Sequence, residues 1–150
     1  LKHGRRLHLG RMMARAMLRV AGDLPADAVI VPVPSHPLRL WQRGFNQAAA
    51  IARQVARQSS RPLAVDVLTR VRATPSTKGL TRRARQKNVE GAFRVAHPDQ
   101  VAGRTVILVD DVMTTGATVQ ACATRLLRAG ARHVEVLTYA RALREGQGGM

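Results

Sequence analysis

Apolar residues recur along the chain with two spacings, one typical of amphipathic helices and one typical of buried strands. Helical spacing is evident near the amino end, where six apolar residues share a predicted face: Leu9, Met12, Met13, Ala16, Met17 and Val20. The clearest strand signal is the apolar run that ends at Asp110. In chain order the pattern predicts a helix over Arg5–Ala21, a strand over Ala28–Val33, a helix over Asn46–Gln58, a strand over Leu63–Val71, a strand over Thr105–Asp110, a helix over Ala117–Ala129 and a strand over His133–Tyr139.

The order of these elements predicts an α/β fold. Strands that alternate with helices form a mainly parallel central sheet with helices on both faces. Pro32 and Pro34 end the first strand, and Gly130 is the glycine that often follows the last turn of a helix. Since 150 residues make about one domain, we expect a single domain over residues 1–145 and a frayed tail over 146–150.

One segment does not follow this alternation of strand and helix patterns. Arg72–Lys87 combines proline, glycine, four Ser or Thr and six Arg or Lys, and it has no apolar periodicity. A long loop without regular structure inside a compact domain is usually functional or disordered. We therefore expect a flexible basic loop that closes over a charged ligand, and a merely solvated surface loop is the alternative.

The net charge of the chain indicates which classes of partner it attracts. Its 25 Lys and Arg stand against 9 Asp and Glu, for a net charge of +16. Such an excess attracts polyanions, namely nucleic acid, phosphorylated metabolites or an acidic membrane surface. Because the arginines are scattered along the chain, they could also serve only as solubilising residues.

Cys122 is the only cysteine, which excludes an intrachain disulfide and a multi-cysteine zinc site. We therefore expect a cytoplasmic protein. No apolar run approaches the roughly 20 residues that span a bilayer. The first residue is Leu rather than Met, which indicates a fragment of a longer protein.

The strongest chemical signal is the run "VILVDDVMTTGAT", in which two aspartates end a buried strand. Ligands of open parallel sheets bind outside the carboxyl ends of the strands. The Thr-Gly segment that follows opens a helix, and a helix start is a ready anion site. The carboxylates of Asp110 and Asp111 can accept hydrogen bonds from sugar hydroxyls or hold magnesium directly or through its waters. A ribose 5-phosphate fits both ends of this arrangement.

Three alternatives are less specific. A Walker-B strand also ends in an acid, but its partner motif needs a Gly-Lys pair that the sequence lacks. A receiver domain carries two acids after its first strand, and the roughly 40 residues that follow Asp111 are too few for the rest of that fold. The structural alternative is a helix that follows a strand, with Asp111 as its cap.

The run resembles the phosphoribosyl-diphosphate (PRPP) motif of type I phosphoribosyltransferases. By this resemblance Asp110 and Asp111 hold the ribose hydroxyls. The 5-phosphate is then bound by the residues of the following loop: Thr114, Thr115, Gly116, Ala117 and Thr118. Some members of that superfamily carry an aspartate where Thr114 stands and use it near the base, so purine-base salvage of that kind is not expected here.

Most of the chain resembles the ComF family of competence-associated, phosphoribosyltransferase-like proteins. The resemblance rests on "VPVPSHPLRLWQRGFNQAAAIAR" and on "TPSTKGLTRRARQKNVEGAF". Thr77 stands where that family usually has Gln, and Ala84 where it often has Glu. The family's amino-terminal zinc-ribbon-like segment is absent from this chain. The resemblance implies a link to competence and nucleoside metabolism.

If the ligand is PRPP, the reaction displaces pyrophosphate from the anomeric carbon through an oxocarbenium-like transition state. Mg²⁺, carried by the substrate, would neutralise part of the departing charge. The turn after the first predicted strand, together with one loop lysine, is expected to bind the pyrophosphate: Pro34, Ser35, His36 and Lys78. Arg85 matches a family position and is the expected catalytic cation, beside Asp110 and Asp111.

The sequence is compatible with two functions. The first is a Mg²⁺-dependent phosphoribosyltransferase whose acceptor the sequence does not identify. The second is a non-catalytic module that binds PRPP, a nucleotide, single-stranded DNA or competence proteins. Four aromatic residues argue against base stacking on nucleic acid. A homodimer is possible in either case.

Overall fold

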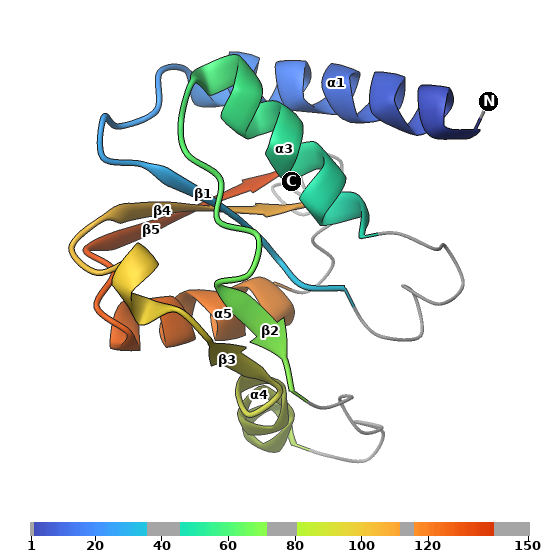
Figure 1. The fold of residues 1–150 in the computed structure, drawn as a ribbon. Coiled ribbons are helices and arrows are strands. Elements are labelled where there is room, and N and C mark those ends of the chain that lie inside the picture. The colour runs from blue at the N-terminus through green and yellow to red at the C-terminus, as the bar shows by residue number, and fades with distance from the viewer. Residues whose placement is uncertain (1, 36–45, 72–80, 112–115, 140–150) are drawn as a thin grey trace, which may run out of the picture.

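The computed structural model describes residues 2–35, 46–71, 81–111 and 116–139 (Figure 1). Within these ranges the elements, in chain order, are α1 (Lys2–Ala21), β1 (Val29–Pro32), α3 (Gln47–Ser59), β2 (Leu68–Arg70), α4 (Arg82–Glu90), β3 (Phe93–Val95), the 3-10 helix η1 (Pro98–Gln100), β4 (Thr105–Asp110), α5 (Ala117–Arg128) and β5 (His133–Thr138). No helix in the described ranges is long and apolar enough to cross a membrane.

The central sheet has the strand order β1-β4-β5, and both strand pairs are parallel. Helices α1 and α3 cover one face and α5 covers the other, as Figure 1 shows. The predicted α/β class with a parallel sheet between helices is therefore confirmed.

Two hydrophobic cores lie on opposite faces of this sheet. Because side chains alternate along a strand, β4 supplies both cores. Val106 and Leu108 face α5, and Ile107 and Val109 face α1 and α3. All four are at most 1% exposed. The predicted core position of Cys122 is confirmed, since it is fully buried in the α5 core.

The predicted strand over Leu63–Val71 is wrong in its extent and in its pairing. Leu63 forms one isolated parallel bridge to Ile30, and regular pairing begins only at Leu68. From there β2 pairs antiparallel with β3, a strand that the apolar pattern did not predict. The two strands form a separate two-stranded sheet, in which β3 packs against α5 (Figure 1).

The expectation of an irregular loop over Arg72–Lys87 is wrong for its second half, where α4 begins at Arg82. The N-cap residue Thr81 explains the start, because its hydroxyl accepts a hydrogen bond from Ala84 N–H at 3.1 Å. Val89 is buried and helps to hold the helix against α5. Residues 72–80 of the predicted loop lie outside the described residues.

The buried face of α1 is rotated about the helix axis relative to the predicted apolar face. Met13 and Met17 are buried as expected, but Leu9 and Met12 are more than half exposed and Val20 is 89% exposed. Small residues take their place against α3. A side chain at Gly10 would lie 3.7 Å from the Ala50 carbonyl oxygen, so the two helices approach closely at this point.

The amino ends of the central strands are tied together by Asp27. Its Oδ2 accepts hydrogen bonds from Thr105 N–H at 3.0 Å and from the Thr105 hydroxyl at 3.1 Å. Arg132 donates to the same oxygen at 2.6 Å. This clamp fixes the end of the sheet opposite to Asp110.

Candidate functional site

The carboxyl ends of β1 and β4 lie side by side. Pro32 is in register with Val109, and Val33 N–H donates to the Val109 carbonyl at 2.9 Å. The residues that follow each strand therefore meet at one edge of the sheet. This edge brings the half-buried Pro34 and Ser35 together with Asp110 and Asp111, as the sequence predicts.

The paired aspartates are held by the backbone around them. The Asp110 side chain accepts a hydrogen bond from Asp111 N–H at 2.9 Å. The Asp111 carbonyl accepts one from Tyr139 N–H at 3.2 Å, which ties the pair to the end of β5. Both aspartates are half-buried. The arrangement keeps two carboxylates close together at a defined position on the strand edge.

Two helices begin at the same edge (Figure 1). Helix α3 starts after Asn46, whose side chain accepts from Ala49 N–H at 3.3 Å and donates to the Val33 carbonyl at 3.5 Å. Helix α5 starts after Gly116, which has φ 82° and ψ −4°. Both helix starts direct positive partial charge toward the strand ends, which favours an anion there.

The alternative role of Asp111 as the cap of α5 is wrong. The N-cap is Gly116, and no side chain of the described residues caps this helix. A non-glycine residue is strained at this positive φ, which accounts for glycine. The half-buried Ala117 and Thr118 form the first turn of α5.

Arg70 is a charged neighbour that sequence reasoning missed. It ends β2, its Nε atom is buried, and its guanidinium carbon lies 4.9 Å from the centre of the Phe93 ring. Burial raises the pKa of the Cys122 thiol, the Asp110 carboxylate raises this pKa further, and the Arg70 guanidinium lowers it. Both charges therefore influence the same buried thiol of α5.

Other predicted site residues are not placed. His36, Lys78, Thr114 and Thr115 lie outside the described residues. Arg85 belongs to α4, which packs against α5 rather than forming an irregular lid, and its side chain lies outside the described side chains.

The described residues contain no group of three or more His, Cys, Asp or Glu side chains that could hold a metal ion. Carboxylate oxygens are the ligands that Mg²⁺ prefers, but an all-protein cage would need more of them than Asp110 and Asp111 provide. The pair therefore fits a Mg²⁺ that remains largely hydrated or is shared with a phosphorylated ligand.

Comparison with known proteins agrees with this geometry. The phosphoribosyl transferase domain family matches residues 42–147. "DNA utilization protein YhgH" of Salmonella typhi is 38% identical over 149 residues, covering 95% of this chain and 65% of that protein. "Competence protein F" of Haemophilus influenzae is 33% identical over 141 residues, covering 89% of this chain and 62% of that protein. The chain thus spans slightly less than two thirds of the length of these relatives.

Solved structures share the fold. The glutamine phosphoribosylpyrophosphate (PRPP) amidotransferase from B. subtilis, complexed with ADP and GMP, is similar with a TM-score of 0.55 and 24% identity. The similarity covers 87% of this chain and 25% of that one. At this identity the comparison shows a common fold.

Proposed function

Because the chain belongs to the phosphoribosyl transferase domain family and to its ComF group of competence-associated proteins, we propose that its strand-edge site binds PRPP and transfers the phosphoribosyl group to an acceptor with the help of Mg²⁺. One observation carries the proposal. Two carboxylates and a glycine-started helix lie at the same end of the sheet. These groups are complementary to the two ends of a ribose 5-phosphate.

The sugar would be held by Asp110 and Asp111, whose oxygens accept hydrogen bonds from the ribose hydroxyls. The 5-phosphate would lie at the start of α5, where Gly116 lets the backbone approach it. This arrangement would fix the anomeric carbon between the two aspartates and the turn at Pro34 and Ser35.

In the proposed reaction the bond between the anomeric carbon and a diphosphate oxygen breaks, and the diphosphate leaves with the bonding electrons. The acceptor forms the new bond to the same carbon. The developing positive charge on the sugar favours nearby carboxylates, and the departing negative charge favours cations. Arg85 and Lys78 are the proposed cations, and Mg²⁺ would neutralise part of the diphosphate charge when bound.

A double variant tests the binding step. Asp110→Asn with Asp111→Asn keeps the size of both side chains and removes both charges. Hydrogen bonds to charged groups contribute about 1.5–3 kcal/mol each, so we expect PRPP affinity to fall by about 100-fold or more. Calorimetry with PRPP, with and without Mg²⁺, measures this loss.

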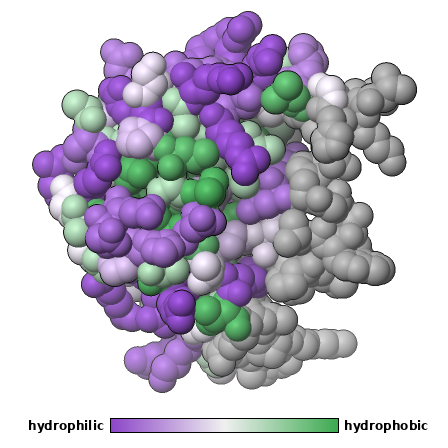
Figure 2. Space-filling model, viewed as in Figure 1, coloured by the Kyte–Doolittle hydropathy of each residue, from purple (hydrophilic) through white to green (hydrophobic). Residues whose placement is uncertain are grey.

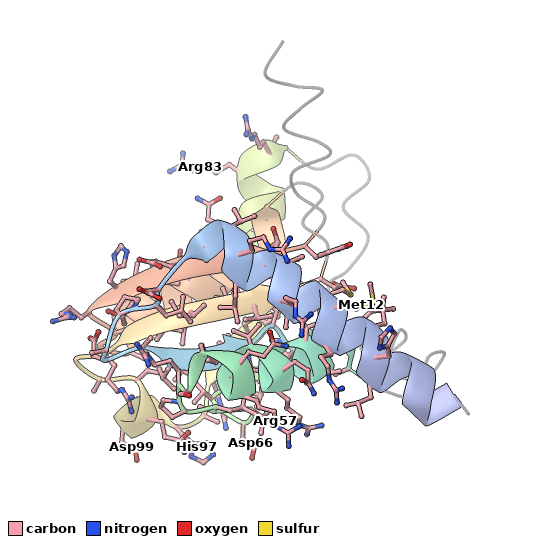
Figure 3. The ribbon with its side chains drawn as sticks, turned by 90° about the horizontal axis from the view of Figure 1, so that it is seen from above. Met12, Arg57, Asp66, Arg83, His97 and Asp99 are labelled. Atoms are coloured by element: carbon pink, nitrogen blue, oxygen red, sulfur yellow. The ribbon has the colours of Figure 1, made fainter. Side chains whose placement is uncertain are left out.

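The matched control is Asp66→Asn with Asp99→Asn. Both residues are exposed, and both lie on the lower edge of the view in Figure 3. This variant also loses two negative charges, but away from the proposed site, so it reports the effect of the change in net charge alone. Unchanged PRPP affinity in a folded Asp110/Asp111 variant would contradict the assignment of the ribose site.

A second candidate is a non-catalytic module that binds single-stranded DNA. The names of two relatives, "DNA utilization protein YhgH" and "Competence protein F", and the net charge of +16 favour it. Filter binding over a salt series separates the two functions, since single-strand binding weakens with a slope of roughly −0.7 per phosphate neutralised. Tight binding at physiological salt that PRPP does not displace would favour the second candidate.

A further inference from the structure

Helix α1 lies along one edge of the molecule, and its outer side is open to solvent along its length (Figure 1). Its inner side packs against α3 and the sheet through Gly10, Met13, Ala14 and Met17, all buried. At 1.5 Å rise per residue, its 20 residues make a straight surface about 30 Å long. The outer side of α1 is neither uniformly polar nor uniformly apolar.

A row of arginines follows one side of this outer surface. Arg11, Arg15 and Arg19 are spaced four residues apart and are all exposed. Like charges at this spacing repel and destabilise a helix unless an anion lies beside them. No aspartate or glutamate occurs in α1 or in α3, and α3 adds the exposed Arg53 and Arg57. The two helices therefore carry positive charge and no negative charge of their own.

A row of apolar side chains runs beside the arginines. Leu9 is 51% exposed, Met12 is 56% exposed and Val20 is 89% exposed. Figure 3, which views the molecule from the side of α1, shows Met12 at the outer surface of this helix. An isolated exposed apolar residue needs no explanation, but three on one stripe of one helix indicate an interaction surface.

From this combination we propose that the outer surface of α1 is a peripheral docking surface for an anionic lipid membrane. Helices of this type lie in the plane of the interface, with apolar side chains at the boundary between headgroups and acyl chains. Leu9, Met12 and Val20 would enter that boundary, and the arginine row would contact lipid phosphates. Hereafter these six residues are called the α1 surface.

Two other partners fit the α1 surface less well. Nucleic acid would contact the arginines, but it would gain nothing from the apolar row, and neither α1 nor α3 contains an aromatic residue on which a base could stack. A second copy of this chain would bring a second arginine row against the first. An anionic bilayer satisfies both rows at once.

The proposal is tested on the whole chain by co-sedimentation with vesicles of phosphatidylglycerol and phosphatidylcholine, compared with vesicles of phosphatidylcholine alone. The charge variant combines Arg11→Gln, Arg15→Gln and Arg19→Gln. Each basic residue near an anionic surface contributes roughly fivefold in affinity, so this variant should lose on the order of 100-fold. The apolar variant combines Leu9→Gln, Met12→Gln and Val20→Gln, keeps every charge, and should lose about tenfold or more.

The control variant combines Arg82→Gln, Arg83→Gln and Arg94→Gln, which are exposed arginines of α4 and β3. Helix α4 lies on the opposite side of the molecule from α1 (Figure 1). The control loses the same net charge and should bind the mixed vesicles like the wild type. Circular dichroism checks that all variants remain folded.

Three results would overturn the proposal. One is the absence of binding to the mixed vesicles. Another is a charge variant that loses binding while the apolar variant keeps it, since this would indicate a purely electrostatic surface for a polyanion such as single-stranded DNA. The third is a concentration-dependent dimer, detected by light scattering, that the apolar variant abolishes. None of these measurements depends on PRPP binding.

Discussion

Replacement of Gly116 by alanine is the sharpest test of how the start of α5 is built. Gly116 has φ 82° and ψ −4°, a conformation that L side chains rarely adopt. Gly130 offers a matched control at the other end of the same helix, because it has φ 107°. Both substitutions add one methyl group at a positive φ, but only Gly116 lies at the proposed phosphate site.

The cost in stability should be similar at the two positions. A left-handed conformation costs a non-glycine residue about 1–2 kcal/mol. At Gly130 an added Cβ would lie 3.6 Å from the Ala102 Cβ, which is an ordinary contact, so strain dominates there as well. For a chain of this size 1 kcal/mol shifts the melting temperature by about 2–4 °C. We therefore expect both variants to melt about 2–8 °C below the wild type.

The two variants should differ in ligand binding. Relief of the strain at residue 116 requires a change in backbone direction, which turns the first N–H groups of α5 away from the phosphate. A tenfold loss corresponds to about 1.4 kcal/mol, and we expect at least this loss of ribose 5-phosphate affinity in Gly116→Ala. Calorimetry with ribose 5-phosphate and thermal melts of both variants provide the two measurements. The Gly130→Ala variant should bind like the wild type.

A folded Gly116→Ala protein with the affinity of the wild type would refute this reasoning. It would place the phosphate away from the helix start, and the role of Gly116 would then be limited to the turn between β4 and α5. Equal losses of affinity in both variants would point to a general loosening of α5, which also contradicts a local phosphate contact.

Two further predictions concern stability and reactivity. Burial alone would raise the pKa of Asp27, but hydrogen bonds from Thr105 and the charge of Arg132 outweigh burial and hold this pKa below its ordinary value of 3.8. The ionised Asp27 therefore stabilises the fold above the unfolded-state pKa, and this stabilisation is lost as pH falls through the folded-state pKa. Urea midpoints should accordingly fall more steeply in acid for the wild type than for Asp27→Asn. Burial raises the pKa of the Cys122 thiol, so Cys122 in the folded protein should resist a thiol reagent at mildly alkaline pH and react fully in denaturant. A rapid reaction of the folded protein would instead show that α5 opens.

Apolar periodicity predicted the elements whose buried side chains are large and regularly spaced. The strand over Thr105–Asp110 and the helix that starts at Ala117 were predicted with the observed first residues. Helix α4 was missed because Val89 is its only side chain described as buried, so its start depends on the Thr81 cap rather than on periodicity. Strand β3 was missed because three residues are too few to show a period.

The wrong face of α1 has a different cause. Hydrophobicity favours Leu9 and Met12 over Gly10 and Ala14 as core residues. The structure instead buries the small pair, and a Cβ added at Gly10 would already be in van der Waals contact with the Ala50 carbonyl of α3. The distance between two helices is a tertiary property that the spacing of apolar residues along one helix does not contain.

The strand-edge rule predicted Asp110, Asp111 and Gly116 at one edge, since it needs only the positions at which strands end and helices begin. It gave no sign of Arg70, whose place depends on the antiparallel pairing of β2 with a strand about 25 residues later in the chain. Residues that reach a site through such non-local pairing have no short-range pattern in the sequence.

Paired carboxylates repel each other, so their retention in so basic a chain needs a physical reason. Part of it is local. The Asp111 N–H satisfies one Asp110 oxygen, and the start of α5 provides positive partial charge beside the pair. These two contributions offset part of the repulsion and hold the pair at the strand edge, the arrangement that the proposed ribose site requires.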